Sequence, residues 1–117
     1  MAKVPDIDVP AIRKRLVMRR NEVEQLIAND GDDRRPVELD QQAVGRLSRM
    51  DAMQVQAMAE ETHRRREAEI KRIDAALQRI ADDEYGWCTS CGEEIALKRL
   101  ENDPATPLCI DCAGRAS

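Results

Sequence analysis

The strongest constraint on the fold of this 117-residue chain is a pair of Cys-x2-Cys motifs near its C-terminal end. Cys88 and Cys91 form the first pair, Cys109 and Cys112 form the second, and 17 residues separate the two pairs. Two cysteines three positions apart can bind one metal ion from a tight turn, and a second pair completes a tetrahedron with Zn–S bonds of about 2.3 Å. Such a site leaves no position for water or substrate. The motifs therefore predict one structural zinc ion per chain and argue against an enzyme.

A thiol redox pair is the main alternative reading of a Cys-x2-Cys motif. A thioredoxin-like motif lies at a helix start within a βαβ unit, and this sequence shows no alternation of strand and helix patterns. The sequence also lacks a signal peptide and any apolar stretch of the roughly 20 residues needed to span a bilayer. We therefore expect a cytoplasmic protein that does not bind membranes, and in that reducing compartment zinc explains the cysteines better than disulfides do.

The composition favours an elongated helical protein over a compact globule. The chain has no Phe, one Trp and one Tyr, while 36% of its residues are charged. A helical hairpin stapled by a metal needs less buried surface than a globular core does. The formal net charge of −4 lies in the last 35 residues, and the run Arg64–Arg66 follows Glu60 and Glu61 as expected for a solvated helix face. We therefore expect no direct DNA binding.

The first helix is predicted over residues 10–28, after a disordered leader at 1–9. Pro10 suits a first helical turn, and the helix then carries apolar residues at spacings of four and seven: Ile12, Leu16, Val23 and Ile27. Residues 29–36 gather Gly, Pro and acidic side chains, which predicts a break. The pattern does not decide between helix and loop over the wider stretch 29–47.

The second helix is predicted from Ser48 to residue 82, because Ser48 and Asp51 resemble a capping box and nothing breaks the helix before Asp82. A coiled-coil seam with steps of four and three runs through Ala59, His63, Arg66, Ile70, Ile73, Leu77 and Ile80. In the N-terminal half of this helix the apolar residues are spread around the helix, and their flexible side chains are expected to pack loosely: Met50, Met53, Val55 and Met58. These patterns predict an antiparallel helical hairpin over 10–82 with its tip near 40–50.

Residues 83–117 are predicted to form the zinc module. Gly92 supplies the turn of the first knuckle, Pro104 and Pro107 keep the return segment irregular, and a short helix is expected after Cys109. Ile95, Leu97 and Leu100 are expected to cover the metal side. Tyr85 and Trp87 are expected to pack the second helix onto this module. His63, the single histidine, is interpreted as a seam or surface residue.

The run from Asp83 to Glu101, followed by Pro104 and Leu108-Cys-Ile-Asp-Cys112, closely resembles the C4-type zinc finger of the DksA/TraR family, the DnaK suppressor proteins. The resemblance covers about 30 residues and many positions besides the cysteines. The long helix that precedes the finger is similar to the coiled-coil arm of the family. The chain is thus identified as a short member.

This resemblance implies a transcription regulator that binds bacterial RNA polymerase at the rim of its secondary channel, with zinc in a structural role. Acidic residues at the coiled-coil tip then act in the channel. The family's Asp-x-x-Asp-x-Ala tip motif aligns with Gly45, Ser48 and Met50, so Asp40 or Asp51 would replace its aspartates, with Arg49 beside them. The alternative is a zinc-stapled protein-interaction module without direct control of transcription.

The resemblance also bears on the nucleotide effector ppGpp, which some members sense through basic residues on the second helix and after the last cysteine. Arg65 and Arg72 match the helical positions, whereas Ala113 replaces the basic residue after Cys112. The ppGpp set is therefore incomplete in this sequence. We expect a monomer.

Overall fold

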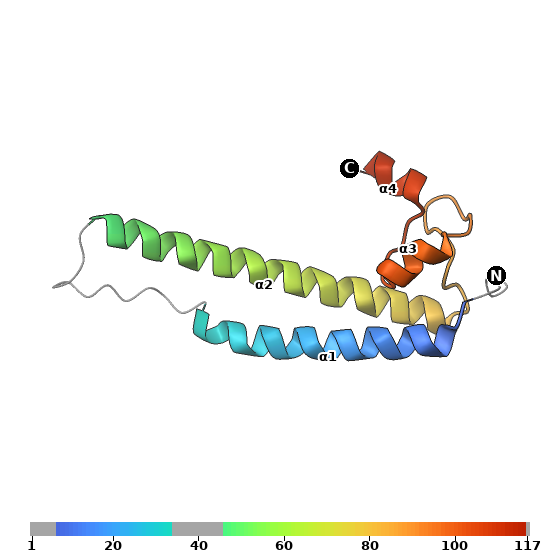
Figure 1. Cartoon of the computed structure of the whole chain (residues 1–117), viewed down its shortest axis with the longest axis horizontal. Coiled ribbons are helices and arrows are strands. Elements are labelled where there is room, and N and C mark those ends of the chain that lie inside the picture. The colour runs from blue at the N-terminus through green and yellow to red at the C-terminus, as the bar shows by residue number, and fades with distance from the viewer. Residues whose placement is uncertain (1–6, 34–45, 117) are drawn as a thin grey trace.

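The computed structural model describes residues 7–33 and 46–116. Two long helices, α1 (Val9–Asp33) and α2 (Arg46–Ala81), lie side by side and run in opposite directions (Figure 1). Two short helices follow, α3 (Leu97–Asn102) and α4 (Ile110–Ala116). Within the described ranges no β-strand is present, and one isolated bridge joins Trp87 and Glu94. The predicted mainly α fold, a helical hairpin with a small C-terminal module, is confirmed.

The N-terminal end of α1 is capped by an aspartate. The Oδ1 atom of Asp8 accepts a hydrogen bond from the backbone N–H of Ala11 at 3.2 Å, and its carbonyl accepts the first helical bond from Ile12 at 3.0 Å. This is the arrangement of an N-cap residue, with Pro10 in the first turn, where its missing N–H is not needed. The helix thus begins one residue before the predicted start, and residues 1–6 of the predicted leader lie outside the described part.

The C-terminal end of α1 corrects the sequence prediction. The helix continues through Asn29 and Gly31 to Asp33, whereas the sequence predicted an end at residue 28. Each unfavourable residue costs only about 0.5–1 kcal/mol in a helix, so a few of them do not outweigh the hydrogen bonds of a helix already formed. The expected break at 34–36, the unresolved choice over 34–45 and the tip residue Asp40 lie outside the described residues.

Helix α2 begins at Arg46, two residues before the predicted start. Ser48 is therefore the third residue of the helix, and its predicted role as the N-cap is wrong. The opposite end is closed by a Schellman motif, in which Glu84 N–H bonds Arg79 C=O at 2.8 Å and Asp83 N–H bonds Ile80 C=O at 3.2 Å. Asp83 takes the left-handed position of this motif with φ 57°.

The hairpin is held by an apolar seam and by two charged clamps across α1 and α2. Ile12, Leu16 and Val23 are buried on α1, and Ile73 with Ala76 is buried on α2. Most of the residues predicted for the seam of each helix are therefore buried or half-buried, and Ala76 is a buried seam residue that was not predicted. Beside the seam, Arg19 donates two hydrogen bonds to Glu69 at 2.6 and 3.0 Å, and Arg20 donates to Asp74 at 2.6 Å.

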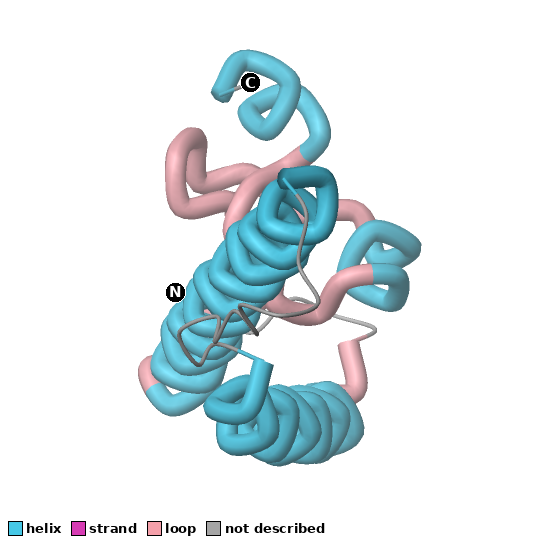
Figure 2. Tube along the Cα trace, turned by 90° about the vertical axis from the view of Figure 1, so that its left-hand side faces the viewer, coloured by secondary structure: helices cyan, strands magenta, loops and turns pink. Residues whose placement is uncertain are grey.

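The base of the hairpin and the C-terminal module share one hydrophobic core. That core joins residues of α1, α2 and the module: Ile12, Leu16, Ile73, Ala76, Tyr85, Cys88, Ile95, Leu100, Ala105 and Cys112. Seen end-on, α3 and α4 lie around the end of α2, and α4 is the element farthest from α1 (Figure 2). The module therefore closes the end of the hairpin where α1 begins and α2 ends.

The first half of α2 differs from the base because its apolar side chains are exposed. Met50, Met53, Val55 and Met58 are 58–69% exposed, so the expected loose packing is wrong for the described part of the chain. The molecule measures 66 × 29 × 19 Å, and among the described residues the first turns of α2 lie farthest from the module (Figure 1). None of the helices described is both long and apolar enough to cross a membrane.

Candidate metal centre

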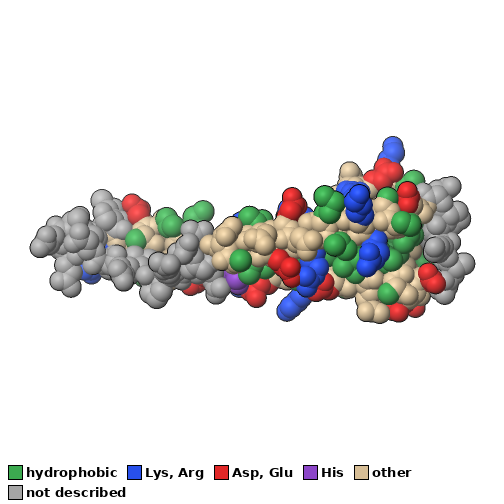
Figure 3. Space-filling view, turned by 90° about the horizontal axis from the view of Figure 1, so that it is seen from below, with side chains coloured by type: hydrophobic (Ala, Val, Ile, Leu, Met, Phe, Trp, Pro, Cys, Tyr) green, Lys and Arg blue, Asp and Glu red, His purple; other side chains and the backbone are tan. Residues whose placement is uncertain are grey.

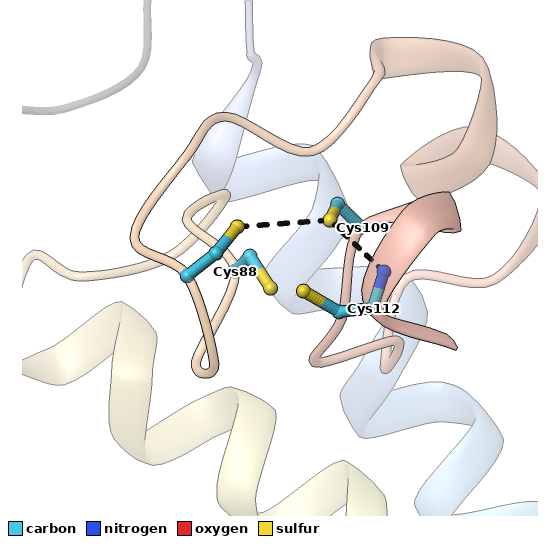
Figure 4. A group of neighbouring side chains, drawn as sticks. Cys88, Cys109 and Cys112 are labelled. Atoms are coloured by element: carbon cyan, nitrogen blue, oxygen red, sulfur yellow. Dashed lines mark hydrogen bonds between the residues drawn. The ribbon is translucent and has the colours of Figure 1, made fainter. Parts of the chain in front are cut away.

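The four cysteine sulfur atoms come together between two knuckles. All four lie within 4.8 Å of one another, and the Sγ atoms of Cys91 and Cys109 are 3.7 Å apart. The labelled cysteines in Figure 4 direct their sulfur atoms toward a common centre. A tetrahedron with Zn–S bonds of about 2.3 Å has sulfur atoms about 3.8 Å apart. The donor set and its spacing therefore fit one zinc ion, and four sulfur ligands would leave no open position on it.

The first knuckle is a hydrogen-bonded turn from Cys88 to Gly92. Cys88 N–H bonds Glu93 C=O at 2.8 Å, and Gly92 N–H bonds Cys88 C=O at 3.0 Å. Gly92 has φ 78°, which lies in the left-handed region that glycine adopts without steric cost. The predicted role of Gly92 in this turn is therefore confirmed.

The second knuckle leads into α4. Cys109 directly precedes the helix and Cys112 lies in its first turn, where the Cys112 N–H bonds the Cys109 sulfur at 3.5 Å. The helix expected after Cys109 is thus confirmed. A further bond from Thr89 N–H to Pro107 C=O at 2.9 Å ties the first knuckle to the segment that enters the second.

Hydrogen bonds within the cluster shift the pKa values of two cysteine thiols in opposite directions. A hydrogen bond from the Cys109 backbone lowers the pKa of the Cys88 thiol to about 6, whereas hydrogen bonding with the Cys109 sulfur raises the pKa of Cys112 to about 12. Four thiolates this close repel one another unless a divalent cation lies among them. Binding of the ion would therefore displace protons from the cysteines.

Two prolines and two aromatic residues shape the surroundings of the centre. Tyr85 is 4% exposed and its hydroxyl donates to the Pro104 carbonyl at 2.7 Å. Burial raises the pKa of Tyr85 to about 12. Trp87 is half-buried in the bridge to Glu94. The packing role predicted for Tyr85 is confirmed by its place in the shared core, and the return segment is irregular as the prolines predicted.

The hydrophobic cover of the module differs from the prediction at one position. Ile95 and Leu100 are buried as expected, but Leu97 is 40% exposed. Leu97 begins α3, a helix that the sequence analysis did not predict, and the helical repeat turns Leu100 toward the core while Leu97 faces partly outward.

Comparison with known proteins connects this centre to a family. Residues 83–117 match the family described as the prokaryotic dksA/traR C4-type zinc finger. The whole structure is similar to that of transcription factor DksA2 from Pseudomonas aeruginosa, with a TM-score of 0.73 and 27% identity, over 96% of this chain and 84% of that one. The finger of this chain is thus of the DksA/TraR type, and the chain as a whole is similar in fold to DksA2.

Curated relatives in this family match over the finger. The RNA polymerase-binding transcription factor DksA of Escherichia coli K12 is 49% identical over 43 residues, which cover 37% of this chain and 28% of the relative. The protein of the same name from Haemophilus influenzae is 49% identical over 43 residues, which cover 37% of this chain and 30% of the relative. These matches thus span less than a third of the relatives' length.

The structure separates the predicted tip residues from the metal centre. Arg49 and Asp51 are exposed in the first turns of α2, about 45 Å from its other end at 1.5 Å per residue. The side chain of Ser48 lies outside the described part of the structure. His63, near the middle of the helix, is buried in the seam with Nε2 3.1 Å from Glu67 Oε1.

The two predicted effector residues lie on α2 but have different surroundings. Arg65 is largely exposed, with Nε 3.5 Å from Glu61 Oε1. Arg72 instead donates to Asp103 Oδ2 at 2.6 Å, and so connects α2 to the loop after α3. The sequence could not predict this ion pair, because the two residues are 31 positions apart and neither belongs to a regular pattern.

Proposed function

We propose that this protein regulates transcription by binding bacterial RNA polymerase at the rim of its secondary channel, with the zinc finger outside and the helical hairpin directed inward. The observation that carries the proposal is the similarity of fold to transcription factor DksA2 over 96% of this chain. It is supported by relatives named RNA polymerase-binding transcription factor DksA, which share 49% of the residues in the matched finger region.

The shape and the surface of the hairpin suit insertion into a channel. The first half of α2 is narrow, lies far from the finger and exposes Met50, Met53, Val55 and Met58. Exposed flexible methionines commonly form protein-interaction surfaces, because their side chains adapt to a partner's shape. The exposed charges of Arg49 and Asp51 lie in the same region and would be carried into the channel with it.

The proposed mode does not use DNA as the partner. On the face shown in Figure 3, acidic side chains lie among the basic ones along the body of the molecule. Arg19 and Arg20 are engaged by Glu69 and Asp74, so they are not presented as a basic stripe. A DNA-binding surface requires clustered Lys and Arg that face phosphates. We accordingly propose a cytoplasmic, non-enzymatic monomer whose zinc is structural.

We propose no response of this protein to ppGpp. The Arg72 guanidinium is engaged by Asp103, and Ala113 provides no basic side chain after the last cysteine. A phosphate group would have to displace the Asp103 carboxylate from Arg72 before it could bind there.

A competition assay tests the proposed partner. Zinc-loaded protein should displace labelled E. coli DksA from RNA polymerase, because both would occupy the channel rim. Absence of displacement at saturating concentration would refute the proposal. In transcription assays, Arg49→Gln and Asp51→Asn should alter promoter output while polymerase affinity changes little, and Arg64→Gln, an exposed charge farther back on α2, serves as the matched control. If the tip variants leave transcription unchanged, the protein is an interaction module without transcriptional control.

A further inference from the structure

The four cysteines of the metal centre differ in their access to solvent. Cys88 and Cys112 are 3% and 8% exposed and belong to the shared core, whereas Cys109 is half-buried and Cys91 is exposed. The environment of Gly92, next to Cys91, is open as well, since a Cβ atom added there would have no neighbour within 4 Å. The first knuckle therefore projects its second cysteine into solvent, while its first cysteine is packed inside.

A cavity of about 390 Å³ adjoins this exposed side. Cys91, Cys109 and Cys112 contribute to its wall, and Cys88 does not. The remaining wall residues are Glu93, Glu94, Ala96, Ile110, Asp111 and Arg115. We call this cavity the Cys91 opening. It connects three of the four sulfur ligands to bulk solvent from one direction.

We propose that the metal ion of this module enters and leaves through the Cys91 opening, and that Cys91 is the first ligand to detach. A competing chelator bonds to the ion from this side as the bond to the Cys91 sulfur breaks, and the released thiolate then takes a proton from solvent. Cys88 and Cys112 keep their bonds until last, because the shared core holds their backbone in place. This order of detachment does not depend on the proposed role in transcription.

The charge at the opening determines how fast a chelator of given charge can remove the metal ion. Glu93, Glu94 and Asp111 give the wall three carboxylates against one guanidinium, that of Arg115. An anionic chelator is repelled by this wall, and the repulsion weakens as salt shortens the Debye length. A neutral chelator of similar size does not experience the same barrier.

The first test locates the detaching ligand by chemical labelling. Folded, zinc-loaded protein is treated briefly with iodoacetamide, and the modified cysteine is identified by peptide mass spectrometry. Cys91 should be modified about tenfold or more faster than Cys88 and Cys112, since exposed thiolates react and buried ones do not. Modification of Cys88 or Cys112 first, or of all four cysteines at one rate, would overturn the proposal.

The second test follows zinc transfer from the loaded protein to EDTA, which is anionic, and to a neutral pyridyl chelator. Both transfer rates should rise with chelator concentration. The Glu93→Gln/Glu94→Gln variant should accelerate transfer to EDTA about threefold or more at low salt, with a smaller gain near 0.5 M salt, and should leave the neutral chelator's rate unchanged. Glu84→Gln is the matched control, because Glu84 is exposed but does not line the opening.

A third variant separates this route from release through unfolding. Val23 is fully buried in the hairpin away from the shared core, so Val23→Ala lowers the stability of the hairpin without touching the opening. Transfer rates equal to those of the unmodified protein support the proposal. Faster transfer in Val23→Ala, independent of chelator concentration, would show that unfolding releases the ion and that the opening plays no part.

Discussion

The hydroxyl of Tyr85 should make the stability of this protein fall steeply at alkaline pH. Its pKa is raised by burial to about 12 in the folded state, against an ordinary value of about 10. The folded state therefore retains this proton more tightly than the unfolded state does. The contribution of Tyr85 is complete below pH 10 and is lost as the pH rises toward 12. Linkage gives a loss of about 1.4 kcal/mol at pH 11 and a limit of about 2.7 kcal/mol above pH 12.

Tyr85→Phe provides the matched comparison, because phenylalanine does not titrate. Below pH 10 the variant should be about 1 kcal/mol less stable, since it loses the 2.7 Å hydrogen bond to the Pro104 carbonyl. Near pH 11 the two proteins should be equally stable, and above it the variant should be the more stable. Denaturant unfolding of the zinc-loaded proteins at a series of pH values measures this crossover.

The titration itself can be observed directly, because Tyr85 is the only tyrosine in the chain. Absorbance of tyrosinate near 295 nm should rise with a midpoint near pH 12 in folded protein and near pH 10 in denaturant. A folded-state midpoint near pH 10, or a stability difference between the two proteins that is constant with pH, would refute the reasoning.

Three further predictions concern the core, the clamps and the metal. Ile73→Ala should lower the free energy of unfolding by about 2–5 kcal/mol, whereas Val55→Ala, at an exposed position of the same helix, should change it by less than about 0.5 kcal/mol in denaturant titrations. A double-mutant cycle on Arg19 and Glu69 should give a coupling of about 0.2–1 kcal/mol that falls with added salt; a coupling insensitive to salt would contradict an exposed ion pair. Removal of zinc should abolish hydrogen-exchange protection in α3 and α4 and weaken it at Leu16, while α2 retains helical circular dichroism; unchanged protection of α3 would show that zinc is dispensable for the fold.

The sequence was most informative where one spacing has one physical meaning. Two Cys-x2-Cys pairs determine a four-sulfur centre, and a repeat of four and three determines which side of α2 is buried. The repeat did not identify Ala76, which is fully buried in the core that α1, α2 and the module share. Its burial depends on a neighbour that is distant in the sequence, so periodicity within one helix cannot predict it.

Helix ends were predicted less well, because the helix propensities of single residues determine only weakly where a helix ends. Asn29 and Gly31 disfavour a helix, yet α1 includes both. The caps that the structure shows were also missed. Asp8 was assigned to a disordered leader although it caps α1, and Asp83 occupies a left-handed position where glycine is the usual signal. The side chain of Asp83 gave no indication of this backbone conformation.

The position of the finger on the hairpin depends on contacts that involve both parts. Within the finger, Tyr85 reaches Pro104. Arg72 of α2 reaches Asp103 and Arg15 of α1 donates to the Glu101 carbonyl at 3.0 Å, so these two contacts connect the hairpin to α3 and the loop after it. Their acceptors all lie between Cys91 and Cys109, in the segment whose ends the metal draws together. The ion therefore stabilises the finger and, through this segment, the direction in which the hairpin projects. If the finger is seated on a polymerase rim, loss of zinc would remove the fixed direction of the hairpin even while α2 remained helical.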